Sequence, residues 1–143
     1  MSYLFDDLVE ILPLNFISPM TIGLRNQPSG VAIPIDVSTT QSHYIIRADV
    51  PGISLSDISV EVSDTDVLTI SAHRKNEVQK DEESKIGERY YGKFVRSLKF
   101  PKDSIVTDSI KAELANGELV IKILKKKSGN ENKIIKVFQK GKL

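Results

Sequence analysis

The chain has 143 residues, with 20 Lys and Arg against 19 Asp and Glu, and a formal net charge of +1 at pH 7. It has no cysteine and two histidines, which excludes a disulfide scaffold and a thiolate zinc site and argues against a multi-histidine metal site. The near-zero net charge gives no general argument for binding nucleic acid. The first charges are acidic and no run approaches the roughly 20 apolar residues that span a bilayer, so a cytoplasmic protein without a transmembrane segment is predicted.

Residues 1–30 are predicted to form an N-terminal arm. Four of the six prolines fall within the first 34 residues, and the segment is too apolar for an ordinary disordered tail and too proline-broken for a compact domain. A short helix is predicted from about Tyr3 to Leu12 on its apolar periodicity. Such a flexible, partly helical arm either packs on its own domain or contacts other subunits, a membrane surface or unfolded protein. The candidate contact residues are Leu4, Phe5, Leu8, Ile11, Leu12 and Phe16.

Residues 31–126 are predicted to form one β-rich domain. Alternating apolar residues predict strands at 44–50, 58–62, 68–72, 94–100, 110–114 and 119–123. A four-residue loop at 63–66 and the pair Asn116-Gly117 each predict a hairpin, since Asn-Gly tolerates the positive φ of a tight turn. Short strands with regular turn signals favour an all-β, immunoglobulin-like β-sandwich.

Residues 74–93 interrupt this pattern with six basic and five acidic residues. A loop of this length is either a solvent-exposed excursion or a segment that closes over a site or reaches a neighbouring subunit. Its end, Ile86 to Tyr91, has enough β-propensity to add a strand to another sheet. Residues 127–143 form a lysine-rich extension that also holds Ile134, Ile135, Val137 and Phe138, which a purely electrostatic arm would not need.

No catalytic motif is present, and neither an enzyme nor a cofactor or metal site is predicted. His43 and His73 are expected to be exposed at strand ends. The Asp64-x-Asp66 pair is explained by a tight turn. Arg96 shares a predicted strand face with Phe94 and Leu98, so its guanidinium is expected to have a structural role and to need a carboxylate or backbone carbonyls as partners.

The order of these motifs resembles the small heat-shock proteins, the α-crystallin family. The resemblance is carried by Ile35-Asp36-Val37, Ala48-Asp49-Val50-Pro51-Gly52, Leu68-Thr69-Ile70-Ser71-Ala72, the run from Glu88 to Leu98, Phe100-Pro101, Ala112-Glu113-Leu114-Ala115-Asn116-Gly117-Glu118-Leu119 and Ile135-Lys136-Val137. The family's A-x-x-x-N-G-x-L signature makes Gly117 and Leu119 structural positions, with Arg96. The long loop is similar to that of bacterial and plant members.

The resemblance implies roles for three segments. The loop would carry a short strand across to a partner's sheet, through Ile86, Glu88, Arg89, Tyr90 and Tyr91. The tail would insert Ile135 and Val137 into a groove between two edge strands of another dimer, with Ile134 giving a second possible register. The groove is expected at residues Val67, Leu68, Ile70, Ala112 and Leu114. The apolar residues of the arm would bind clients.

The function that this resemblance implies is an ATP-independent holdase chaperone that keeps unfolding proteins from aggregating under heat or other stress. Its partners would be copies of itself in a large homo-oligomer, unfolded clients, and ATP-dependent chaperones that refold them. One alternative is an adaptor co-chaperone resembling the CS-domain family, which shares the sandwich and typically lacks the tail motif and long loop. A basic-tailed nucleic-acid module is a third class, disfavoured because residues 35–121 carry a net negative charge.

Overall fold

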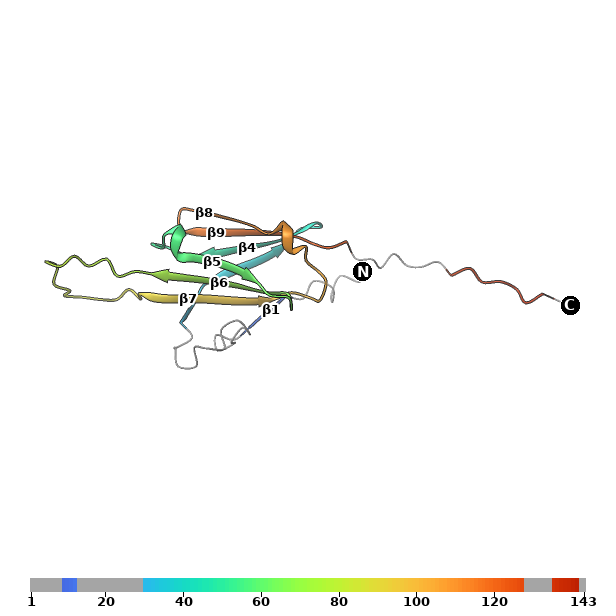
Figure 1. Ribbon diagram of the computed structural model, residues 1–143, viewed down its shortest axis with the longest axis horizontal. Helices are drawn as coiled ribbons and strands as arrows, with labels where there is room; N and C mark the ends of the chain where they lie inside the picture. The colour runs from blue at the N-terminus through green and yellow to red at the C-terminus, as the bar shows by residue number, and fades with distance from the viewer. Residues whose placement is uncertain (1–8, 13–29, 128–134, 142–143) are drawn as a thin grey trace.

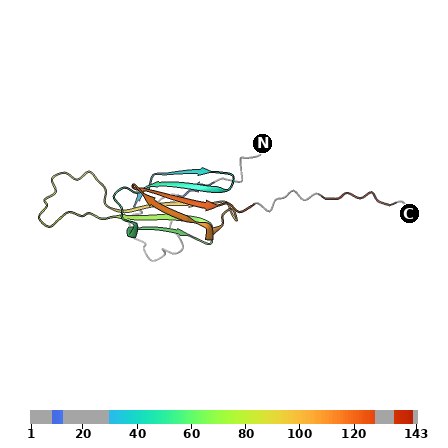
Figure 2. The ribbon, with the colours of Figure 1, turned by 90° about the horizontal axis from the view of Figure 1, so that it is seen from above.

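Two β-sheets stack face to face in the computed structural model, which describes residues 9–12, 30–127 and 135–141 (Figures 1 and 2). The first sheet has the order β1-β7-β6-β5, with β2 also paired to β7, and the second has the order β3-β4-β9-β8. The predicted all-β sandwich is confirmed. The strands are β1 (Glu10–Ile11), β2 (Val31–Ala32), β3 (Ile35–Thr39), β4 (His43–Asp49), β5 (Ile58–Val62), β6 (Val67–Arg74), β7 (Gly92–Lys99), β8 (Lys111–Ala115) and β9 (Glu118–Leu124). Single 3-10 turns, η2 (Leu55–Asp57) and η3 (Thr107–Ser109), precede β5 and β8.

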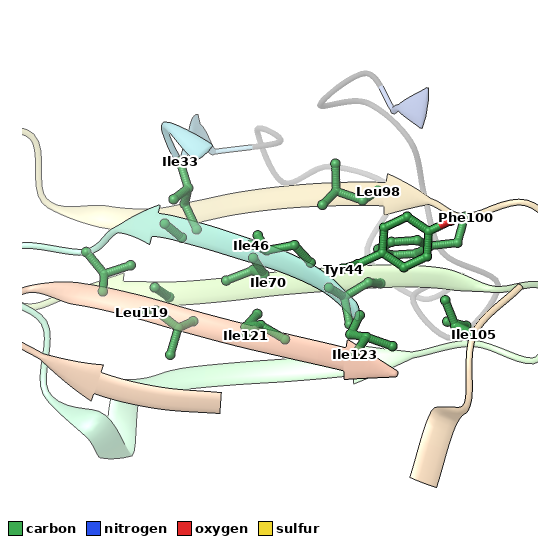
Figure 3. Close-up of a cluster of buried hydrophobic side chains, with 14 of the residues drawn as sticks. Ile33, Tyr44, Ile46, Ile70, Leu98, Phe100, Ile105, Leu119, Ile121 and Ile123 are labelled. Atoms are coloured by element: carbon green, nitrogen blue, oxygen red, sulfur yellow. The ribbon is translucent and has the colours of Figure 1, made fainter. Parts of the chain in front are cut away.

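The core lies between the two sheets and is built from alternate residues of their central strands (Figure 3). Strand side chains two apart point the same way, so every second residue of β4, β6 and β9 faces inward. The rings of Tyr44 and Phe100 meet edge to face, with centroids 5.0 Å apart. The fully buried side chains include Tyr44, Ile46, Leu68, Ile70, Leu98, Phe100, Ile121 and Ile123.

The hairpin between β8 and β9 turns at Asn116 and Gly117, as its sequence predicts. Both residues have positive φ, at 53° and 74°. The Gly117 carbonyl accepts a hydrogen bond of 2.8 Å from the N–H of Val50, and a Cβ added at Gly117 would lie 3.2 Å from the Cα of Pro51. The turn therefore packs directly against the corner that ends β4, which explains why glycine occupies this position.

The connection between the sheets fixes which margins face each other. β2 lies on the edge of β7 in the first sheet, and β3, only two residues further on, forms an edge of the second. Ile33, between them, is fully buried. The side of the first sheet that ends near β7 therefore lies over β3, an edge of the second sheet. The opposite edges of the two sheets, β5 and β8, consequently lie on the same side of the sandwich.

The helix predicted from Tyr3 to Leu12 is wrong where the structure describes it. Glu10 and Ile11 form a strand antiparallel to β7, and the Leu12 N–H donates a 3.0 Å hydrogen bond to the Ser97 carbonyl. The edge of β7 offers backbone partners that helical periodicity cannot reveal, and Val9 packs against the core. The predicted contact residues Leu4, Phe5, Leu8 and Phe16 lie outside the described residues.

Replacing Gly117 with Ala should lower the stability of the domain. The substitution forces an L side chain into positive φ and against Pro51, at a cost of about 1–3 kcal/mol. The midpoint of thermal unfolding by circular dichroism should fall by several degrees. Gly141→Ala is the matched control, because an added Cβ there meets nothing within 4 Å. Equal midpoints for the two variants would contradict the packing of this turn.

Candidate functional site

The predicted edge groove is wrong on one of its two sides. Val67, Leu68 and Ile70 belong to β6, which lies between β7 and β5 and is not an edge strand. Their exposed fractions are 6%, 0% and 0%. Alternation identified the inward face of β6 correctly, but a pattern within one strand carries no information about its neighbours in the sheet. On this side of the sheet the edge strand is β5, and β1 and β2 form the opposite edge.

The observed apolar edge is formed by β5 and β8 and is called here the β5–β8 margin. Its side chains are partly buried and pack against the core at the rim of the sandwich. They are Ile58, Val60 and Val62 from β5, Ile110 beside η3, and Leu114 from β8. Ala112, also predicted at this site, is exposed on β8. Each strand has one row of backbone groups without a strand partner in the described part of the chain. The margin therefore offers apolar contact and hydrogen bonding together.

The long loop leaves the sandwich from the ends of β6 and β7 and extends away from it (Figures 1 and 2). Ile86 is 83% exposed, and Glu88 and Arg89 are also exposed. Residues 86–91 form no strand within this single chain. The loop thus presents an apolar side chain and its backbone to the surroundings, and its pairing with a partner's sheet stays a prediction.

Arg74 anchors the base of this loop. Its Nε and Nη2 donate to the carbonyl of Tyr90, the first at 2.9 Å, and its Nη1 donates to the carbonyl of Pro51 at 3.4 Å. The guanidinium carbon also lies 5.0 Å from the ring centroid of Phe94 and 5.5 Å from that of Tyr91.

Arg89 stacks on the same Tyr91 ring at 5.3 Å and donates to its hydroxyl at 3.0 Å. Tyr90 in turn meets Phe94 edge to face, with ring centroids 5.2 Å apart. A planar guanidinium that stacks and donates in a fixed fork suits this position, whereas a lysine would not. Sequence reasoning missed the role of Arg74 and treated it only as the start of the loop.

Arg96 lies in the inward-facing row of β7, between Phe94 and Leu98, as its spacing predicts. It is partly buried, and its Nε is buried without a hydrogen-bond partner. Among the described residues it forms no ion pair, so the predicted carboxylate partner is not found there. Substitution of Arg96 would therefore leave no carboxylate unpaired within that part of the chain. The hydrogen-bonding capacity of the Arg96 side chain in the middle of β7 is therefore not fully used within the described residues.

The described tail residues, 135–141, form no secondary structure. Ile135 is 81% exposed and Val137 is 92% exposed, with Phe138 similarly open. Ile134, the alternative start of the motif, lies outside the described residues. Burying each of these side chains against a partner would contribute roughly 1.5–3 kcal/mol, and the role of the tail as an anchor stays a prediction.

The described residues contain no group of three or more His, Asp or Glu side chains able to hold a metal ion. A hollow of about 570 Å³ lies on the outer face of the second sheet, beside His43, Lys111, Glu113 and Lys122. Both histidines were predicted to be exposed at strand ends; His73 is exposed near the end of β6, whereas His43 at the start of β4 is partly buried. No helix in the described ranges is long and apolar enough to cross a membrane.

Comparison with known proteins identifies what the chain is similar to. The model of the Hsp20/alpha crystallin family matches residues 36–138. A 22.0 kDa heat shock protein of Arabidopsis thaliana is 34% identical over 117 residues, which cover 79% of this chain and 59% of that protein. The chain thus matches less than two thirds of the length of this curated relative.

Two solved structures share the fold. Heat shock protein 16.0 from Schizosaccharomyces pombe aligns with a TM-score of 0.63 at 30% identity, covering 80% of this chain and 82% of that one. A small heat-shock protein from Xylella fastidiosa, described as having a distinct high order structure, aligns with a TM-score of 0.57 at 31% identity. It covers 77% of this chain and 96% of that one.

Proposed function

The chain belongs to the Hsp20/alpha crystallin family, whose members are small heat-shock chaperones, and from this membership we propose that it is an ATP-independent holdase. In this role it binds unfolding proteins through apolar surface and prevents their aggregation under heat or other stress. The observation that carries the proposal is the apolar β5–β8 margin together with a tail whose Ile135 and Val137 are almost fully exposed. These surfaces suit binding rather than catalysis.

The proposed mechanism is exchange between self-contacts and client contacts. At rest, subunits bury one another's apolar segments. Heat loosens these contacts, and exposed apolar segments of clients bind in their place. The sequence has no nucleotide-binding motif, so the exchange is driven by the relative affinities of subunit and client segments. The charged loop and the lysine-rich tail keep the complex soluble.

Assembly is proposed to use the tail and the β5–β8 margin. Ile135 and Val137 are two residues apart, so in an extended tail both side chains point the same way and can pack between Val60 of β5 and Leu114 of β8. The eleven residue steps from Leu124 to Ile135 reach at most about 36–40 Å. A domain of this size is only about 30 Å across, so the tail can reach its own domain or another subunit, and the family resemblance favours the second.

The dimer is proposed to form through the long loop. Residues 86–91 of one chain would pair with an edge strand of the partner, and β3 is suited to this because its residues are largely exposed and it pairs only with β4 in the described chain. The Arg74 contact to Phe94 would hold the base of the loop, and its contacts to Tyr90 and Tyr91 would fix the near end of the segment that crosses over.

One further partner and a compartment belong to the same proposal. Clients held in this way would pass to ATP-dependent chaperones for refolding. A cytoplasmic location is consistent with the absence of cysteine, since a reducing compartment gives disulfides no role. The adaptor role of CS-domain proteins is not favoured, because the family match extends through the tail motif to residue 138.

The holdase proposal predicts that the purified chain suppresses the thermal aggregation of citrate synthase without ATP. Light scattering at the heating temperature should fall as the ratio of subunits to client rises. Addition of ATP should change nothing, because no nucleotide site is proposed. Undiminished scattering at equal subunit ratio, with the chain itself folded, would reject the proposed function.

The tail proposal predicts that Ile135→Gly combined with Val137→Gly reduces large assemblies to dimers, because two buried anchors are lost. Native mass, measured by size-exclusion chromatography with light scattering, is the readout. Lys136→Gly is the control, since its side chain lies on the opposite side of an extended tail and it adds backbone freedom within the same motif, at one position instead of two. If the double variant kept the mass of the control, the tail would not bridge subunits.

A further inference from the structure

The outer edge of β7 is covered by two short pieces of the N-terminal arm. β6 pairs along the whole of β7 on one side, from Arg74↔Gly92 to Val67↔Lys99. On the other side β2 pairs with Phe94 and Val95, and β1 pairs with Leu98 and Lys99. The backbone of β7 is thus an edge that the chain masks with its own segments, in the way that proteins protect exposed edges.

The two covering pieces differ in how firmly they are held. β2 continues directly into Ile33, which is fully buried and donates from its N–H to the Val95 carbonyl at 3.3 Å. β1 has only two residues, and Ile11 is 58% exposed. Beyond its two-residue pairing with β7, it is held by the Leu12–Ser97 hydrogen bond and by the packing of Val9 against the core. A strand with so few buried contacts opens at low free energy, so β1 is the removable piece.

Removal of β1 would uncover a defined surface. The backbone groups of Ser97 and Lys99 would lose their partners, and the rim of the core beneath Val9 would be exposed. Next to them lies Arg96, between the two covering pieces, with its Nε buried and unpartnered. The site is therefore the four-residue edge 96–99, and at one end it adjoins the apolar rim of the core on which Val9 packs.

The occupant seen in the structure shows what this edge accepts. Residues 9–12, Val-Glu-Ile-Leu, bind it antiparallel and in extended form, through backbone hydrogen bonds that need no particular side chains, with Val9 against the core. Unfolding proteins expose segments of this kind. Addition of a strand to a sheet edge is a general mode of peptide recognition, with side-chain pockets supplying selectivity.

We propose that β1 is a displaceable cover and that edge 96–99 of β7 binds an extended apolar segment of an unfolding client as an added antiparallel strand when β1 leaves. This inference rests on the proposed holdase function and names one surface for it. The surface is separate from the β5–β8 margin, because β7 and β5 lie on opposite sides of β6.

A reversible lock tests the displacement. Glu10 and Lys99 are directly paired, and both are exposed. In an antiparallel pair of strands, hydrogen-bonded residue pairs recur at every second position, so the Leu12–Ser97 bond makes Glu10 and Lys99 such a pair as well. The Cα atoms of such a pair lie about 5.5 Å apart, which is within the range that a disulfide spans. The chain has no cysteine of its own, so Glu10→Cys with Lys99→Cys yields a single bridge that a reductant opens.

The expected result is that the oxidised double variant needs several-fold more subunit than its reduced form to suppress citrate synthase aggregation. Lys111→Cys with Lys122→Cys, which bridges the directly paired strands β8 and β9, is the matched control and should respond little to reductant. Equal protection by the locked and reduced forms would overturn the proposal. Failure of the wild-type chain to protect at all would instead reject the holdase function itself.

A photo-crosslinker tests occupancy of the edge directly. With p-benzoylphenylalanine at position 99, crosslinks should fall on residues 9–12 at rest and on citrate synthase during heating. The same group at Lys122, on the outer face of the second sheet, is the control and should capture less client. Crosslinks from position 99 to a second copy instead of the client would overturn the proposal, as would no client crosslink while aggregation is suppressed.

Discussion

The structure depends on how the edges of its two sheets are covered. An open sandwich leaves edge strands with backbone donors and acceptors that must find partners, and such edges invite pairing with other chains. In the described part of the chain only the β7 edge is covered, by β1 and β2, whereas β3, β5 and β8 present theirs outward. The loop around Ile86 and the tail around Ile135 are exposed, and they are the segments proposed to bind such edges.

The inward and outward faces of most strands could be predicted because a strand has a strict period of two. Tyr44, Ile70 and Ile121 are fully buried as their alternation indicates, and Asn116-Gly117 turns where its conformational preference places it. The positions of strands within the sheets could not be predicted in this way. Sequence reasoning placed β6 at an edge because nothing in its own pattern shows that β5 and β7 flank it.

The errors at single residues have related causes. Glu10 and Ile11 fit a helical pattern, yet in the fold they meet unpaired backbone of β7, and tertiary pairing overrides local preference. A carboxylate or backbone carbonyls were expected as partners of Arg96 because a buried guanidinium needs them, and its Nε has none in the described chain. Arg74 was overlooked because its partners are the carbonyls of Tyr90 and Pro51, 16 and 23 residues away, which no side-chain motif reveals.

In the proposed function, the apolar edges and exposed segments of one small sandwich bind one another between copies until an unfolding protein competes for them. The most direct test of this account is the mass of the unmodified chain in solution, measured by native mass spectrometry at micromolar concentration without client. Dimers and larger multiples of the 15.9 kDa subunit are expected. A single species at 15.9 kDa would contradict this account, because the edges and segments would then remain uncovered at rest.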